Sequence, residues 1–165
     1  MTIADRLIRR AKRTPYYHLG NYMERYWLVP YNRTIIHEDG QTHGTGRVPW
    51  LKRPVARLLQ TFGIAVRVHR ILRSDYGRDF HDHPWNFLSV ILKGGYNEAT
   101  PADPHGAWYG AGSVLFRRAT DWHRLVLPWT GEAWTLFISG PRIQRWGFLV
   151  DGKKVPYPEY KGVIE

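Results

Sequence analysis

The stretch "GRDFHDHPWNFLSVILKGG", residues Gly77 to Gly95, decides the fold class of this 165-residue chain. It sets His81 and His83 one residue apart, ahead of an apolar run from Phe87 to Leu92 that has the composition of a buried strand. Alternate residues of a strand share a face, so a regular strand would direct both histidines and Phe87 to one side and Asp82 to the other. Two imidazoles that point into an apolar interior need a partner, and a metal ion is one candidate.

The chain around this stretch consists of short apolar runs broken by turn residues. Spacers such as "DYGRD", "TPADPHG" and "WTGE" supply the Gly, Pro, Asp and Thr of tight turns. Several strands without intervening helices are typical of an all-β sandwich, jelly roll or small barrel. The predicted strands cover residues 64–74, 86–99, 112–119, 123–128, 133–140 and 146–150.

The N-terminal third has a different pattern. Thr2 and Asp5 form a capping-box pattern before apolar residues at helical spacing, which predicts a short basic helix. A second helix is predicted from Pro54 to Phe62, followed by Gly63 at a C-cap position. We therefore expect residues 1–62 to form a partly helical extension packed on a barrel of residues 63–165, within one structural domain.

The composition restricts the classes of function. The chain has no cysteine, so a metal would be held by nitrogen and oxygen ligands alone. A formal net charge of +10 suits a small anionic ligand, and it makes nucleic acid a possible partner that is not favoured because the charge is spread along the chain. No secretory signal or membrane-spanning apolar run is visible, which predicts a cytoplasmic protein with no membrane partner.

A third histidine lies in "GSVLFRRATDWHRL", residues Gly112 to Leu125. The two stretches together resemble the two motifs of the cupin superfamily, the RmlC-like jelly rolls: G-x5-H-x-H-x3,4-E-x6-G and G-x5-P-x-G-x2-H-x3-N. His81, His83 and Gly94 match the first motif, and Gly112 and His123 match parts of the second. Residues 64–149 also resemble small, uncharacterised cupin-like proteins of bacteriophages and prophages, which would place the protein in the host cytoplasm.

The resemblance implies a cupin double-stranded β-helix, a jelly-roll barrel, with a metal site formed by His81, His83 and His123. Phe87 stands where the motif has its metal-binding Glu, so the implied site has three histidines and no carboxylate, similar to the site of thiol dioxygenases. Three imidazoles suit Fe, Zn, Ni or Cu, and the uncompensated charge of a divalent ion would attract an anionic substrate. Asp121 either orients a histidine or caps the turn before the strand.

Other residues near these motifs are candidates for binding and catalysis. One face of the strand 64–74 is interior, and either face buries an arginine, which needs an anion or a hydrogen-bond network. An internal carboxylate, Asp75 or Asp79, could supply that partner, or a substrate anion could. The candidate binding residues are Arg67, Arg73, Arg117 and Trp85, and the candidate catalytic residues are Tyr96 and His69.

The sequence therefore predicts a metal-binding cupin that acts on or binds a small anionic molecule, with dioxygenase-like or isomerase-like chemistry. Two alternatives remain open. One is a non-catalytic protein of bacteriophage type that binds a ligand or a host factor. The other is a metal-free sugar-nucleotide epimerase, for which His69, Asp121 and Tyr96 are the candidate base, its carboxylate partner and the acid. A homodimer is compatible with each of these.

Overall fold

The computed structural model describes residues 1–16, 18–29, 34–36, 42–44, 53–75, 77, 79–129 and 131–161. Strands dominate these residues, as the turn-rich sequence predicts. The helices are α1 (Ile3–Ala11), α2 (Arg53–Thr61) and a 3-10 turn, η2 (Tyr157–Glu159). The strands are β1 (Met23–Trp27), β2 (Thr34–Ile36), β3 (Thr42–Gly44), β4 (Ala65–Ile71), β5 (Phe80–His81), β6 (Phe87–Ala99), β7 (Ala107–Gly110), β8 (Val114–Arg117), β9 (Arg124–Val126), β10 (Ala133–Ser139), β11 (Gly147–Val150) and β12 (Lys153–Pro156).

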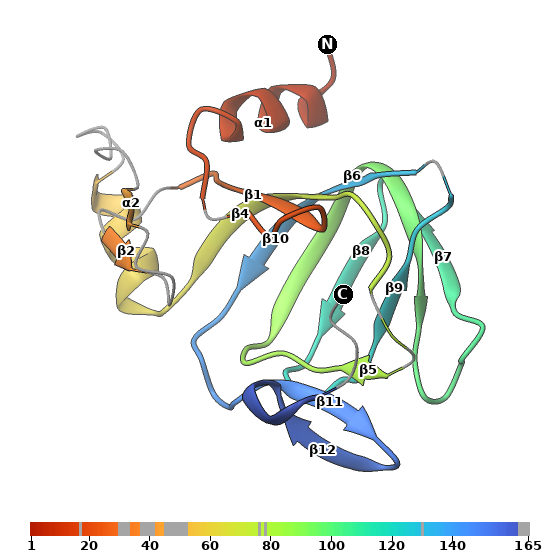
Figure 1. The fold of residues 1–165 in the computed structure, drawn as a ribbon. Coiled ribbons are helices and arrows are strands. Elements are labelled where there is room, and N and C mark those ends of the chain that lie inside the picture. Colours follow the sequence, from red (N-terminus) through yellow and green to blue (C-terminus); the bar gives the residue numbers. More distant parts are fainter. Residues whose placement is uncertain are drawn as a thin grey trace.

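The main sheet is antiparallel and curls around a central strand, β6. Its strand order is β1-β4-β10-β6-β7, with β8 and β9 also paired to β6. The first half of β6 lies between β10 and β8, and its second half pairs with β7 and β9. Different strands thus flank the two halves of β6, and the sheet curls into the half-barrel seen in Figure 1. This confirms the prediction of an all-β barrel with a partly helical N-terminal extension.

A bulge in β6 changes which residues face the barrel interior. In the pairing with β10, Trp134 lies opposite Lys93 and Thr135 opposite Ile91, so Leu92 is an extra residue. Before the bulge Phe87, Ser89 and Ile91 face the interior, and after it Tyr96 does, with the buried Glu98 on the same side of the strand. The bulge therefore brings Glu98 to the interior side of a strand whose first half presents odd-numbered residues.

The interior and the outer face of the main sheet each have an apolar cluster. The outer cluster contains Ala11, Tyr26, Val68 and Trp134, and α1 covers it (Figure 1). The Thr2–Asp5 capping box that starts α1 is formed as predicted. The interior cluster consists of Ile71, Ile91, Tyr96, Leu115, Leu125, Leu127 and Ala133.

The N-terminal extension contributes a strand that the sequence pattern did not reveal. β1 pairs antiparallel with β4 and so forms one edge of the main sheet, although it lies within residues 1–62. The predicted boundary after residue 62 therefore does not separate the barrel from the extension in this part of the chain. Several stretches between residues 30 and 52 lie outside the described residues. Neither α1 nor α2, the two α-helices among the described residues, has the length and apolarity needed to cross a membrane.

A smaller sheet, β12-β11-β5, closes one end of the half-barrel (Figure 1). In it, His81 lies opposite Phe148, and Phe80 lies opposite Leu149. The β11–β12 hairpin thus packs directly against the first histidine of the H-x-H motif.

Candidate metal centre

The backbone brings the two histidine motifs together. His81 and His123 form an antiparallel bridge in which each N–H donates to the carbonyl of the other, at 2.9 and 3.0 Å. The His83 N–H donates to the carbonyl of Ala119 at 3.2 Å, one turn before His123. The strand predicted through both histidines is not continuous, because the chain leaves strand conformation after His81 and resumes it at Phe87, with Pro84 in between. The interrupted strand still directs both imidazoles toward His123.

The three imidazoles form one cluster. His83 Nε2 lies 2.8 Å from His123 Nε2, and His81, His83 and His123 each offer a nitrogen within 4.8 Å of the other two. The three ring centroids are 4.6 to 5.1 Å apart. The sequence motifs therefore identified three side chains that do converge, from β5, the β5–β6 connection and the residue just before β9.

Two carboxylates hold the far nitrogens of this cluster. Glu98 Oε1 lies 2.5 Å from His123 Nδ1, and Asp75 Oδ2 lies 3.5 Å from His81 Nδ1. A carboxylate on Nδ1 fixes the tautomer and directs Nε2 away from it. His123 therefore presents Nε2 to the centre of the cluster, where it meets His83 Nε2, and Asp75 lies at ion-pair distance on the Nδ1 side of His81.

Glu98 is itself held in place. Its side chain is only 2% exposed, and the Arg117 guanidinium donates to it through Nε at 3.0 Å and through a terminal nitrogen at 2.5 Å. Burial acts to raise the pKa of Glu98, but hydrogen bonds from His123 and Arg117 outweigh it and lower the pKa. Glu98 is therefore a charged acceptor at neutral pH.

Burial keeps the other two imidazoles neutral. It lowers the pKa of His81 to about 4, against an opposing effect of Asp75, and together with the neighbouring imidazoles it lowers the pKa of His83 well below the ordinary value. A neutral imidazole has one nitrogen lone pair available for a ligand or a hydrogen bond. The 2.8 Å contact between His83 and His123 is the hydrogen bond that such rings form with each other when one donates to the other.

This donor set fits a divalent transition metal. Three imidazole nitrogens can bind Zn, Fe, Ni or Cu, and a Zn–N bond is about 2.0–2.1 Å long. Two nitrogens bound to the same ion lie slightly farther apart than the 2.8 Å that separates His83 Nε2 from His123 Nε2. A small outward shift of His83 and His123 would make room for the ion. Phe87, at the position of the motif's Glu, puts an apolar ring 4.7 Å from the ring of His83, so this position supplies no ligand atom.

The cluster opens on a cavity of about 260 Å³ inside the half-barrel, here called the histidine cavity. The face of β4 that carries Arg67, His69 and Ile71 lines this cavity. This is therefore the interior face of the strand, which the sequence left open. Val68 points the other way, into the cluster beneath α1. Both faces of β4 are buried because the barrel interior lies on one side and α1 on the other.

Four predicted residues line the histidine cavity with the cluster. The Arg67 guanidinium lies over the rings of Trp27 at 4.9 Å and Trp85 at 5.5 Å, so aromatic faces surround this cation. His69 stacks on Phe137 with ring centroids 4.6 Å apart, and burial first of all lowers its pKa well below the ordinary value. The four residues are Arg67, His69, Trp85 and Tyr96.

Three other predicted residues have different surroundings. Arg117 is not among the residues that line the histidine cavity, because its guanidinium is engaged by Glu98 behind His123. Arg73 lines a neighbouring cavity. Asp121 accepts a hydrogen bond from the Arg118 N–H at 2.8 Å and so caps the turn before β9. The carboxylate that contacts His123 is therefore Glu98, and Asp121 takes the second of the two roles expected for it, the cap of the turn.

Asp82, between the two histidines of the motif, has a role that the sequence did not show. It is 1% exposed and accepts hydrogen bonds from the Gly147 N–H at 2.7 Å and from Gln144 Nε2 at 3.0 Å. Lys154 Nζ pairs with the same carboxylate. Asp82 thus attaches the β11–β12 hairpin to the H-x-H segment, on the side facing away from the cluster.

Comparisons with known proteins describe the fold. No family model matches the chain, and no curated protein sequence matches it either. Among solved structures, the chain is similar to an RmlC-like cupin protein from Ralstonia eutropha, with 13% identity over 86% of this chain and 69% of the other and a TM-score of 0.48. It is also similar to the protein TT1209 from Thermus thermophilus, with 12% identity, coverage of 87% and 98%, and a TM-score of 0.47.

A third similar structure is the polyketide cyclase RemF from Streptomyces resistomycificus, with 13% identity, coverage of 76% and 70%, and a TM-score of 0.46. At such identities and scores, the neighbours carry no argument about the activity of this chain. The fold rests on its own architecture: an antiparallel sheet curled around β6, with three histidines gathered inside it. By that architecture the chain has the cupin-type fold that its two histidine motifs predict.

Proposed function

We propose that the chain binds one divalent transition metal ion through His81, His83 and His123 and acts there on a small anionic molecule. The observation that carries the proposal is the cluster itself, in which the ligand atoms of three histidines lie within 4.8 Å of one another at the wall of an internal cavity. Glu98 supports it, because its hydrogen bond to His123 Nδ1 directs Nε2 of that ring toward the centre.

The charges around the histidine cavity favour an anion. Among the described residues that line it, Arg25 and Arg67 carry charge and no carboxylate does. Three imidazoles would place no negatively charged ligand on a divalent ion, and Glu98 and Asp75 lie behind the ligands instead of on the ion. A carboxylate or phosphate of the substrate is the group that these two arginines and the ion would attract.

The chain supplies groups that can hold and donate protons in this cavity. Burial, first of all, raises the pKa of Tyr96 to about 12, so its phenol remains protonated at neutral pH. His69 Nε2 is buried and has no hydrogen-bond partner among the described residues, which leaves it available to a bound molecule. An ion bound at the cluster would supply a Lewis acid. Dioxygenase and isomerase reactions are the types we propose for such a site.

A second candidate function is metal-free proton transfer. The 2.5 Å contact between Glu98 and His123 Nδ1 is the geometry of a carboxylate that orients a general base, and Tyr96 lines the same cavity. This pair replaces the His69–Asp121 pair that the sequence suggested for an epimerase, because Asp121 caps the turn before β9 instead.

Elemental analysis separates the two candidates. The purified protein is loaded in turn with Fe, Zn, Ni and Cu and then desalted. We expect about one ion per chain in the natural protein, none in the His81→Ala/His83→Ala variant, and about one in His105→Ala, which removes an exposed histidine from the β6–β7 connection. Retention of no metal under any loading condition would overturn the metal proposal and leave the Glu98–His123 pair as the candidate base.

A further inference from the structure

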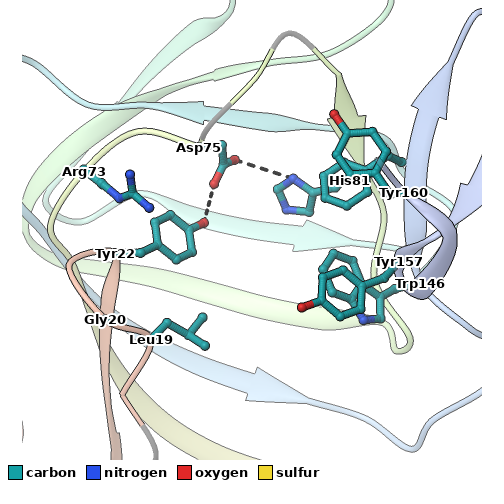
Figure 2. Close-up of a pocket in the computed structure, with 10 residues that line it drawn as sticks. Leu19, Gly20, Tyr22, Arg73, Asp75, His81, Trp146, Tyr157 and Tyr160 are labelled. Atoms are coloured by element: carbon teal, nitrogen blue, oxygen red, sulfur yellow. Dashed lines mark hydrogen bonds and ion pairs between the residues drawn. The ribbon is translucent and has the colours of Figure 1, made fainter. Parts of the chain in front are cut away.

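A second cavity, here called the aromatic cavity, adjoins the cluster on the other side of His81 (Figure 2). Its volume is about 290 Å³. One wall consists of two stacked ring pairs: Trp146 with Tyr157, at a centroid distance of 4.4 Å, and Phe148 with Tyr160, at 3.8 Å. Tyr157 is 42% exposed and the other three rings are partly buried, so all four have surface that a bound molecule could cover.

The opposite wall carries the polar groups. Figure 2 shows Tyr22 and Asp75 across the cavity from the rings of Trp146, Tyr157 and Tyr160, with Arg73 beside Tyr22 and His81 between the two walls. Asp75 already accepts from the Tyr22 hydroxyl and from the Leu125 N–H at 2.7 Å, and it contacts His81 Nδ1. The Asp75 carboxylate thus already has these hydrogen-bond partners. The positive charge on this wall is the Arg73 guanidinium, which lies 5.6 Å from the Tyr22 ring.

The two cavities share part of their lining. Leu19, Tyr22, His81 and Trp146 line both of them. A molecule that occupies the aromatic cavity therefore lies beside a proposed metal ligand.

We propose that the aromatic cavity binds the flat ring of an aromatic carboxylate, with Arg73 as the partner of its charge and His81 at its border. This inference rests on the proposed function in one respect, because it makes the ring part of the molecule that reaches the three histidines. An apolar cavity of about 150 Å³ accommodates benzene, so about 290 Å³ holds a ring with substituents. Stacked or edge-on contact with four aromatic side chains favours a flat ring over a puckered one of the same size.

The test uses benzoate and cyclohexanecarboxylate, two probes of equal charge and similar size, added to protein stripped of metal. Binding is followed through the indole N–H signal of Trp146 in ¹H–¹⁵N spectra, assigned by its loss in Trp146→Phe. We expect benzoate to shift this signal and to bind at least about fivefold more tightly than cyclohexanecarboxylate. Equal binding of the two probes, or no shift with either, would overturn the assignment of the cavity to a flat ring.

Two variants test the walls. Tyr157→Leu removes a half-exposed ring and should weaken benzoate binding by about fivefold or more, whereas Trp129→Leu, which changes a fully exposed ring elsewhere, should not. Arg73→Gln should weaken benzoate binding and leave benzamide unchanged. Unaltered benzoate affinity in both Tyr157→Leu and Arg73→Gln would contradict the proposal.

Metal uptake by a second portion of the same protein, loaded with Fe, Zn, Ni and Cu in turn and then desalted, keeps the two proposals distinct. Benzoate binding by a protein that takes up no metal under any loading condition would support the aromatic cavity and overturn the three-histidine centre. Stoichiometric metal with no preference for benzoate would overturn the aromatic cavity alone.

Discussion

Glu98 lies against His123 at 2.5 Å, from a strand whose first half presents odd-numbered residues to the barrel interior. The bulge at Leu92 is the reason, because one extra residue reverses the alternation of β6 before Glu98 is reached. The Arg117 guanidinium forms an ion pair with the same carboxylate. The chain thus has a carboxylate behind the third histidine, although it lacks the one that the cupin motif places among the ligands.

Replacing Glu98 by Gln should weaken metal binding. The amide keeps the size of the side chain but loses the charge that orients His123 and raises its basicity as a ligand. We expect an affinity about 10–100-fold lower, measured by competition with a chromophoric chelator. Glu159→Gln, which changes an exposed glutamate of η2, is the matched control and should bind metal like the natural protein. Unchanged affinity in Glu98→Gln would show that the carboxylate does not support the ligand.

The stability of the metal-free protein should fall as the pH drops below about 6.5. Burial lowers the pKa of His81 to about 4 and that of His83 well below its ordinary value, whereas unfolded histidines titrate near their ordinary value. Between these limits the unfolded chain binds more protons, so stability is fully present above the unfolded pKa and is lost on acidification. For His81 alone the loss is roughly 3 kcal/mol by pH 4.

Urea unfolding of chelator-treated protein between about pH 7 and pH 4.5 measures this effect. His83→Gln should reduce the change in the free energy of unfolding with pH. The control His105→Gln, at an exposed site, should leave that change as it is in the natural protein. A free energy of unfolding that is constant across this interval in the natural protein would contradict the neutral, buried state of the cluster.

Asp82→Asn should destabilise the fold and loosen the metal centre. Asp82 accepts from the Gly147 N–H and from Gln144 and pairs with Lys154, and an amide can replace only part of this. We expect a loss of about 2 kcal/mol in the free energy of unfolding, together with weaker metal binding. Asp151→Asn is the matched control, because asparagine tolerates the positive φ of 48° at that exposed turn. Equal stability of Asp82→Asn and Asp151→Asn would contradict the role assigned to Asp82.

The barrel strands and the three clustered histidines were predictable because they depend on local patterns. Alternating apolar residues identify β4, β6, β8, β9, β10 and β11 within a few residues, and the H-x-H spacing with His123 identifies the cluster. The helices begin near their expected residues because the Thr2 cap and Pro54 are local signals.

Glu98, Asp82 and β1 were missed because their roles depend on tertiary structure. Strict alternation along β6 would place Glu98 on the outer face, and only the bulge reverses this. The local sequence "LKGG", residues 92–95, does not show which residue forms the bulge. Asp82 gains its partners from Gln144 and from Gly147 and Lys154 of the β11–β12 hairpin, all more than sixty residues away. β1 pairs with a strand that follows a second helix, and its sequence "MERYW" is too short to show a period.

The central claim is that His81, His83 and His123 bind a single ion, and X-ray absorption at the metal K edge of the zinc-loaded protein tests it most directly. We predict a nearest shell with three imidazole nitrogens at about 2.0–2.1 Å, reduced to two in His123→Ala. A shell made only of oxygen atoms, or one unaltered by His123→Ala, would contradict the account.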